Sequence, residues 1–319
     1  MSRVLFAAAG AGDAPAVVAD RAWRLCAEVL ETAGPAAGTP LACHLDRPAR
    51  SCAARQFAGW TAPILDRLRE RSHEPTPLPP VTAPDPRHVE VPVADGVLTP
   101  VRVSSVLHGA EGLFLARRLT HHPVSGLDGA LAGLAYAALS AAGKRDLQAG
   151  LQPHVDPSLC GGCGMCVALC DRGGIRYNGH VSEIQPANCL VCGDCRLECA
   201  TLALRFPPGA GPDIQRRMAA VAAAAAAGKA GRMLWLLFLI DEPERHGVNL
   251  GRRRPWPDLG ILAGDDPVAL DCAARDLVEA ETGRPLHGGD GEAEAAGVLI
   301  EEAERLGVGS SSYRLVSCD

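Results

Sequence analysis

The chain has 319 residues, of which 47% are hydrophobic, and this size and composition are typical of a soluble globular protein with one large domain or two ordinary ones. A net charge of -6, without any Lys- or Arg-rich run, excludes the electrostatic footprint of a nucleic-acid-binding protein. The longest apolar run, residues 233–240, is far shorter than the roughly 20 residues that span a bilayer, so we expect a buried strand and no membrane association.

The elements before residue 152 predict an α/β domain, because strand-like and helix-like patterns alternate. We expect, in chain order, a strand at 4–9, a helix at 14–33, a strand at 40–44, a helix at 56–71, a hairpin formed by 89–93 and 98–103, a strand at 112–116 and a helix at 126–142. Residues 74–86 contain six prolines, which resist helix and sheet, and are expected to lie extended on the surface as a linker.

The α/β pattern resumes after residue 206. The expected elements are a helix at 213–227, strands at 233–240 and 259–263, a helix from Pro267 to Thr282, a helix at 292–306 and a strand at 313–316. Asp266 followed by Pro267 is a strong signal for a helix start, and Gly283 for its end. We therefore predict the fold class as α/β, with one α/β domain formed by residues 1–151 and 207–319 and interrupted by an insert at 152–206.

The insert contains two cysteine runs with the spacing C-x2-C-x2-C-x3-C, which are the only internal repeat of the sequence. The first has Cys160, Cys163, Cys166 and Cys170, and the second has Cys189, Cys192, Cys195 and Cys199. The chain begins MSRVLF, without a secretory signal, so we expect a cytoplasmic protein whose clustered cysteines are metal ligands rather than disulfides. Zinc sites favour paired C-x2-C elements around one ion, not two runs of four.

This spacing predicts two [4Fe-4S] clusters with crossed ligation. Three closely spaced thiolates wrap one cluster, and the fourth cysteine of each run binds the other cluster. The first cluster is then held by Cys160, Cys163, Cys166 and Cys199, and the second by Cys189, Cys192, Cys195 and Cys170. Residues 152–206 resemble a bacterial-type two-cluster ferredoxin, although Asp171 and Ala200 stand where that motif has Pro after its fourth cysteine.

The flanking segments are similar to the domain-of-unknown-function 362 family, whose members often carry a ferredoxin insert at this place. Residues 260–271, GILAGDDPVALD, resemble the family's GILAS-DPVA-D signature. Residues 119–122 and 126–131 resemble its FKGH and GFGGALKN stretch, with Thr120 in place of the family's Lys. The resemblance implies a shared scaffold and supplies no reaction.

Outside the cysteine runs, three residues are candidates for catalysis. His121 and His122 precede Pro123 in an expected loop, where either could act as an acid or simply be structural. Asp265, with Asp266, could bind a ligand at a helix start, although capping explains at least one of the pair. Both segments follow expected strands, so we predict that they meet in one pocket at the carboxyl ends of the sheet.

Two functions remain open at this point. In the first, the protein is an electron carrier that passes single electrons through two [4Fe-4S] clusters to a redox partner protein. In the second, it is an iron-sulfur-dependent reductase of a small organic substrate, for example in a biosynthetic pathway, with the pocket in the α/β domain. No G-x-G-x-x-G or phosphate loop supports a dinucleotide site, while a flavin stays open.

Overall fold

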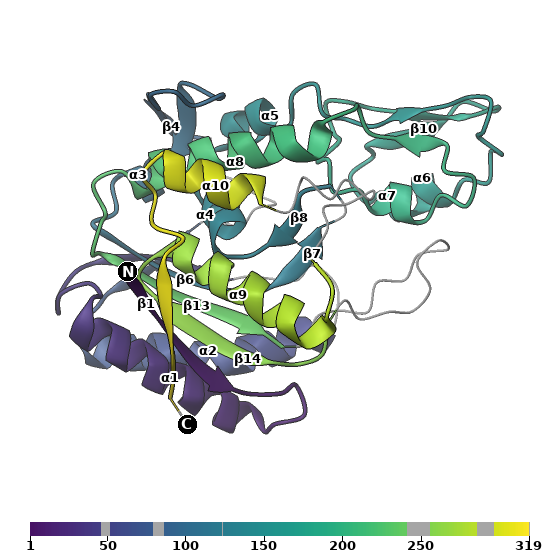
Figure 1. Cartoon of the computed structure of the whole chain (residues 1–319). Coiled ribbons are helices and arrows are strands. Elements are labelled where there is room, and N and C mark those ends of the chain that lie inside the picture. The colour runs from purple at the N-terminus through teal and green to yellow at the C-terminus, as the bar shows by residue number, and fades with distance from the viewer. Residues whose placement is uncertain (46–51, 79–85, 123, 241–255, 286–296, 319) are drawn as a thin grey trace.

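A computed structural model describes residues 1–45, 52–78, 86–122, 124–240, 256–285 and 297–318, and for residues 52–56 the backbone alone (Figure 1). No helix within these ranges is both long enough and apolar enough to cross a membrane. The first part of the helix predicted at 292–306 lies outside the described residues.

A seven-stranded mixed sheet, in the order β15-β1-β14-β13-β6-β2-β3, forms the centre of the molecule. Its strands are β1 (Ser2–Ala8), β2 (Leu41–Leu45), β3 (Pro75–Pro77), β6 (Gly112–Arg118), β13 (Met233–Leu239), β14 (Gly260–Gly264) and β15 (Tyr313–Ser317). Neighbouring strands pair in parallel except that β14 runs antiparallel to both β1 and β13. The predicted α/β class is therefore confirmed, and strands from both sides of residues 152–206 share one sheet.

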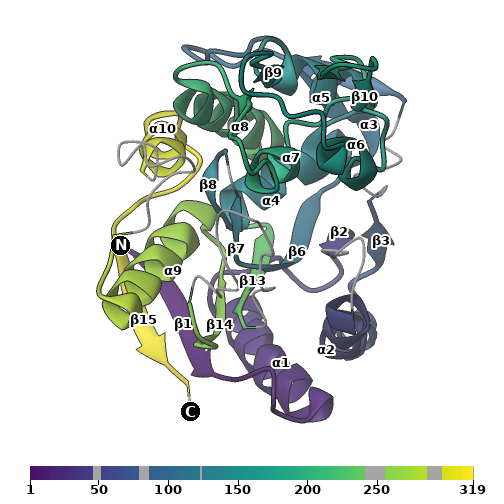
Figure 2. The ribbon, with the colours of Figure 1, turned by 90° about the vertical axis from the view of Figure 1, so that its right-hand side faces the viewer.

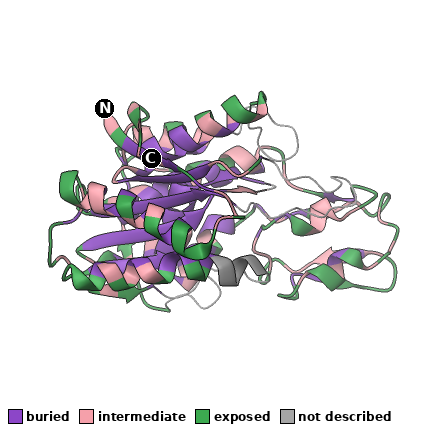
Figure 3. Cartoon of the chain, turned by 90° about the horizontal axis from the view of Figure 1, so that it is seen from below, coloured by how far each residue is buried: buried purple, intermediate pink, exposed green. Residues whose placement is uncertain are grey.

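Strand β13 explains the longest apolar run of the sequence, because helices cover both of its faces. Leu234, Leu236 and Phe238 point to one core, while Trp235 and Leu237 point to the other. Successive side chains of a strand alternate between faces, so a strand in the middle of a two-sided layer is apolar at every position. Figure 3 shows the strands as the most continuously buried part of the chain.

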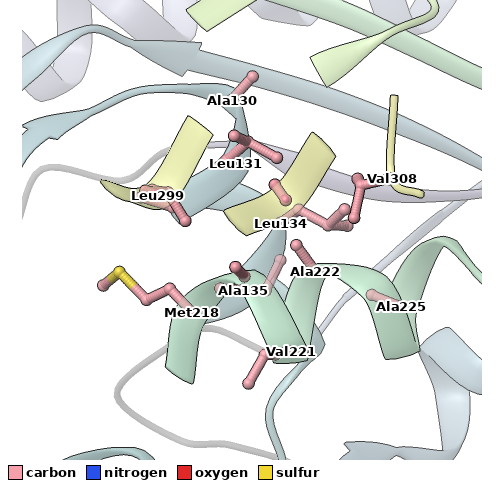
Figure 4. Close-up of a cluster of buried hydrophobic side chains, with 14 of the residues drawn as sticks. Ala130, Leu131, Leu134, Ala135, Met218, Val221, Ala222, Ala225, Leu299 and Val308 are labelled. Carbon is pink, nitrogen blue, oxygen red and sulfur yellow. The ribbon is translucent and has the colours of Figure 1, made fainter. Parts of the chain in front are cut away.

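The two faces of the sheet carry different sets of helices. The first is covered by α1 (Pro15–Thr32) and α2 (Cys52–Glu70), and the second by α4 (Ala130–Ala138), α8 (Ala210–Ala226), α9 (Pro267–Thr282) and α10 (Val298–Arg305) (Figures 1 and 2). Small residues of α4 and α8 let these helices pack closely, with Leu131, Leu134, Met218 and Leu299 filling the space between them (Figure 4).

Two of the predicted elements are wrong in part. Residues 75–77 of the proline-rich segment form β3, which pairs with β2, rather than a linker outside the sheet. Proline is compatible with an edge strand, where one side needs no ladder bond, and β3 lies at the sheet edge. The predicted helix at 126–142 begins instead with strand β8 (Gly126–Asp128), and α4 ends at Ala138, after which Ser140 caps the separate helix α5 (Ala141–Gln148).

Smaller elements complete the α/β part. The predicted hairpin is confirmed as β4 (His88–Val91) paired with β5 (Val101–Ser104), which leads into α3 (Ser105–His108). A second hairpin joins β7 (Thr120–His122) to β8 after the carboxyl end of β6. The predicted cap of α9 is confirmed, because Asp266 Oδ1 accepts hydrogen bonds from the backbone N–H groups of Val268 and Ala269.

Residues 152–206, which we call the cysteine-rich lobe, project from one side of this layered structure (Figure 1). The lobe contains β9 (His154–Val155), α6 (Met165–Leu169), β10 (Ile175–Tyr177), β11 (Ser182–Ile184), α7 (Asp194–Leu197) and β12 (Leu204–Arg205). Its own buried core consists of Cys166, Ile175 and Leu204. Such a small core buries little apolar area, which favours a metal group as a source of folding free energy.

Asp271 of α9 caps a different helix from its own. Its Oδ1 accepts a hydrogen bond from the Ala130 N–H at 2.6 Å, and its Oδ2 accepts one from the Leu131 N–H at 3.0 Å. These donors are the first two of α4, whose own cap residue, Gly129, supplies no side chain. A Cβ on Gly129 would collide with the Asp271 carboxylate, so glycine is needed at this close approach.

Asp271→Ala should lower the free energy of unfolding by about 2 to 4 kcal/mol, because it leaves two buried N–H groups of α4 without their acceptor. Chemical denaturation followed by circular dichroism measures this loss. Glu281→Ala, an exposed change in the same helix, is the matched control and should change stability by less than about 0.5 kcal/mol. Equal stability of the two variants would contradict the capping role.

Candidate metal centre

The two cysteine runs fold alike, residue by residue. Gly164 and Gly193, each directly after the second cysteine of its run, adopt left-handed conformations with φ of 74° and 80° and begin the short helices α6 and α7. Positive φ also occurs at the residue before each second cysteine, at Gly162 and at Val191. The backbone thus curls in the same way around each set of three thiols.

The strands of the lobe pair between the two runs rather than within each run. Strand β9, before the first run, pairs with β12, after the second, with Val155 opposite Leu204. Strand β10, after the first run, pairs with β11, before the second, with Ile175 opposite Ile184. This exchange carries the chain that follows each run back towards the other run, so the fourth cysteine of each run lies beside the other three-cysteine loop.

Two cavities in the lobe are each lined by four cysteines. The cavity of about 120 Å³, which we call the first thiol site, is lined by Cys160, Cys163, Cys166 and Cys199. The cavity of about 410 Å³, the second thiol site, is lined by Cys170, Cys189, Cys192 and Cys195. Each contains three cysteines from one run and the fourth from the other, which is the grouping on which crossed ligation depends.

The thiols surround these hollows instead of converging on a point. Within the described residues, no three His, Cys, Asp or Glu side chains lie close enough together to hold one metal ion directly. Each hollow is larger than a single ion, since one water molecule takes about 30 Å³ of liquid volume. Eight soft sulfur donors around two hollows fit a polynuclear iron-sulfur group, which is bound by four thiolates.

The electrostatics of the second thiol site call for a cation. Burial, together with repulsion from the neighbouring Cys192 and Cys189 thiols, raises the pKa of Cys195 to about 12. Burial likewise raises the pKa of Cys189. Four neighbouring thiolates repel one another, and a bound metal group offsets this repulsion by neutralising their charge.

Hydrogen bonds to sulfur occur at both sites. The Gly174 N–H donates to Cys170 Sγ at 3.2 Å, and Cys166 Sγ lies 3.2 Å from Ser182 Oγ. Burial would raise the pKa of Cys199, but hydrogen bonds that include the backbone of Leu204 lower it below its ordinary value. Hydrogen bonds to thiolate stabilise its negative charge and tune a bound cluster's potential.

The two sites differ in their surroundings. The second is packed against the α/β core, because Val191 is buried in that core and the Gln148 side chain donates to the Leu190 carbonyl at 2.8 Å. The first lies in the outer part of the lobe, where Cys163 is exposed. The second site therefore lies against the α/β domain, although its Cys192 is also exposed, and the first lies farther from that domain.

The two histidines lie on a strand, not in the expected loop. His121 and His122 belong to β7, and the His122 Nδ1 accepts hydrogen bonds from the Val124 and Ser125 N–H groups at 3.2 and 3.1 Å. These bonds hold the turn between β7 and β8, which gives His122 a structural role. A catalytic role for either histidine stays a prediction.

The predicted meeting of the histidines with Asp265 is wrong. Arg118, which comes shortly before β7, pairs with Phe238 near the end of β13. Gly264, which precedes Asp265, pairs with Trp235 near the beginning of β13. Because β14 runs antiparallel to β13, the carboxyl end of β14 lies beside the amino end of β13. Asp265 is half-buried, and burial raises its pKa, but it is far from the histidines along the strands.

A buried ion pair near the second thiol site was missed by the sequence reasoning. The Arg117 Nη2 donates to Asp128 Oδ1 at 2.8 Å, with both side chains largely buried. Arg117 lies over Gly133 of α4, where a Cβ would collide with it. Tyr136, one turn on, has its pKa raised by burial and by the charges of Asp128 and Cys192, so it lies near both of these groups. The sequence signal that could have located this pair was the two arginines, Arg117 and Arg118, at the end of the buried strand β6.

The cysteines outside the lobe are structural where they are described. Cys26 and Cys272 are buried in α1 and α9. Burial raises the pKa of Cys43 to about 12, which keeps this thiol protonated and argues against a nucleophile. The side chain of Cys52 lies outside the described residues.

Comparison with known proteins gives a family. A family model described as domain of unknown function (DUF362) matches residues 70–276, from the end of α2 into α9, and this range contains both thiol sites. Comparison with curated proteins and with solved structures finds no match. Since the match covers well over half of the sequence, the chain belongs to the DUF362 family.

Proposed function

We propose that the protein binds a [4Fe-4S] cluster in each thiol site and transfers single electrons between a redox partner protein and an acceptor. The observation that carries the proposal is the lining of the two cavities, each by three cysteines of one run and the fourth of the other. A cluster supplies a one-electron couple without a proton, which suits a carrier. The paired local folds of the two runs and the repulsion among the thiols of the second site support the same assignment.

The chain's own residues would hold and tune these groups. The left-handed turns at Gly164 and Gly193 aim the backbone around each cavity. The Gly174 N–H and the Ser182 hydroxyl lie within reach of ligand sulfurs. The α/β core covers one side of the second site, and both solvent access and hydrogen bonding set the potential of an iron-sulfur group.

A reductase is the second candidate, and the buried Arg117–Asp128 pair favours it. The pair lies at the carboxyl ends of the parallel strands β6 and β13, the usual place for a ligand site in an α/β sheet. Tyr136 lies near both Asp128 of this pair and Cys192 of the second thiol site. A substrate or a flavin bound there would receive electrons from that site, in which case the α/β domain is catalytic.

Anaerobic reconstitution should give about eight iron and about eight sulfide per chain, because each four-thiol site takes one [4Fe-4S] cluster. Iron and sulfide assays measure this, and flavin is quantified on the same sample. The loaded protein should accept electrons from dithionite and return them to an artificial one-electron acceptor. A colourless protein that binds zinc and does not cycle would contradict the proposal, and stoichiometric flavin would favour the reductase.

Paired cysteine variants should reveal which thiols share a site. In the crossed arrangement Cys170→Ala/Cys189→Ala damages the second site alone and should retain about four iron per chain. Cys170→Ala/Cys160→Ala damages both sites and should retain almost none. Both variants lose two thiols, so each is the control for the other. The opposite pattern would show that each run binds its own cluster.

A further inference from the structure

The first thiol site is surrounded by exposed apolar side chains. Leu159, Met165, Tyr177 and Leu202 are 37%, 50%, 46% and 45% exposed, and we call them the apolar rim. Three of them are next to ligand positions of this site or within the same loop, and Tyr177 lies against it, since a Cβ on Gly162 would be 3.1 Å from the Tyr177 hydroxyl. Large exposed apolar side chains grouped on one small surface indicate an interaction site.

The internal repeat shows that the thiol site itself does not require these side chains. At the second site the positions equivalent to Leu159 and Met165 hold Asn188 and Asp194. Because both halves of the lobe build the same four-cysteine cavity, a polar residue is compatible with the local fold at these two positions. At one position the second site has the apolar residue instead: Leu169 is exposed there, and the equivalent residue at the first site is Glu198.

Leu202 gives the strongest evidence that the apolar rim contacts another molecule. It has a φ of 54°, and its equivalent, Gly173, has a φ of 65°. Glycine adopts this left-handed conformation freely, whereas a residue with a side chain loses about 1 to 2 kcal/mol there. The Leu202 side chain remains largely exposed and so regains little of that loss by burial within the chain. Burial against another molecule would compensate for it.

The occupant follows from the position and charge of this surface. The second site is packed against the α/β core through Val191, although its Cys192 is exposed, and it lacks a matching set of apolar side chains. The apolar rim surrounds the first site alone, where Cys163 is exposed, so we take this site as the contact with a partner. Of the residues that line the first site, all of them described, Glu198 alone is charged. A rim of four apolar side chains fits a small, transient contact that is stabilised by apolar burial rather than by ion pairs.

Resting on the proposed function, we propose that the apolar rim is the docking surface for a one-electron carrier protein whose exposed redox group is apolar, such as the dimethylbenzene edge of a flavin. The carrier loses one electron and the first site gains it, and the second site then receives it on the side of the α/β domain. Because apolar contacts are not screened by salt, this encounter should depend weakly on ionic strength.

The test replaces three residues of the apolar rim by the residues at the equivalent positions of the second site. The triple variant Leu159→Asn, Met165→Asp, Leu202→Gly is compared with wild type as reconstituted holoprotein, with reduced flavodoxin as the probe carrier and dithionite as a small reductant. Stopped-flow absorbance gives the rates, and NMR titration with oxidised flavodoxin gives the dissociation constant without turnover. Leu169→Glu, which copies Glu198 onto the second site, is the matched control.

We expect the triple variant to be reduced by flavodoxin at least about tenfold more slowly and to bind it at least about tenfold more weakly, the effect of losing 1.4 kcal/mol of contact. Its iron content and its rate with dithionite should stay unchanged, and Leu169→Glu should match wild type. Should the triple variant bind less iron, Met165→Gln provides the same comparison with a milder change. Unchanged binding and reduction by flavodoxin would overturn the proposal, as would a dimer that dissociates in the variant, because the rim would then contact a second copy of the chain.

Discussion

Exchange of the fourth cysteine between the two runs is the constraint on which the lobe depends. If each run closed on itself, β9 and β10 would have no reason to pair with β12 and β11. The exchange ties the halves together although their buried core contains only three residues. It also brings eight thiols into a small volume, where their mutual repulsion and burial disfavour the ionised form unless cations are bound.

The sheet determines how this lobe is presented. Its seven strands come from both sides of the lobe, and helices on both faces bury β13 completely. Val191 extends into the core beneath α4 and α8, which fixes the second thiol site against the α/β domain and leaves the first at the periphery. In the proposed electron transfer, the two thiol sites share the same arrangement of cysteines but have different surroundings, and the second lies near Tyr136, which is close to the Arg117–Asp128 pair.

Much of this arrangement could be predicted from local sequence. The cysteine spacing predicted the grouping of thiols, because in this motif three closely spaced cysteines bind one cluster and the fourth binds the other. Asp266-Pro267 predicted the start of α9 through capping chemistry. Strand direction could not be predicted, because the pattern of residues 259–263 is the same whether the strand runs parallel or antiparallel. Because β14 runs antiparallel to β13, Asp265 lies at the opposite end of the strands from the histidines. Nor could the cap from Asp271 to α4 be predicted, because it joins residues distant in sequence.

The central claim is that two iron-sulfur clusters lie side by side in the lobe. Cys166, which belongs to the first site, is among the groups whose charge raises the pKa of Cys195 in the second, so the two sites lie close together. Electron paramagnetic resonance of the dithionite-reduced protein tests this claim most directly. The account predicts a signal that integrates to about two spins per chain, broadened by magnetic interaction between neighbouring clusters. A silent spectrum, or a single isolated spin with all eight cysteines intact, would contradict it.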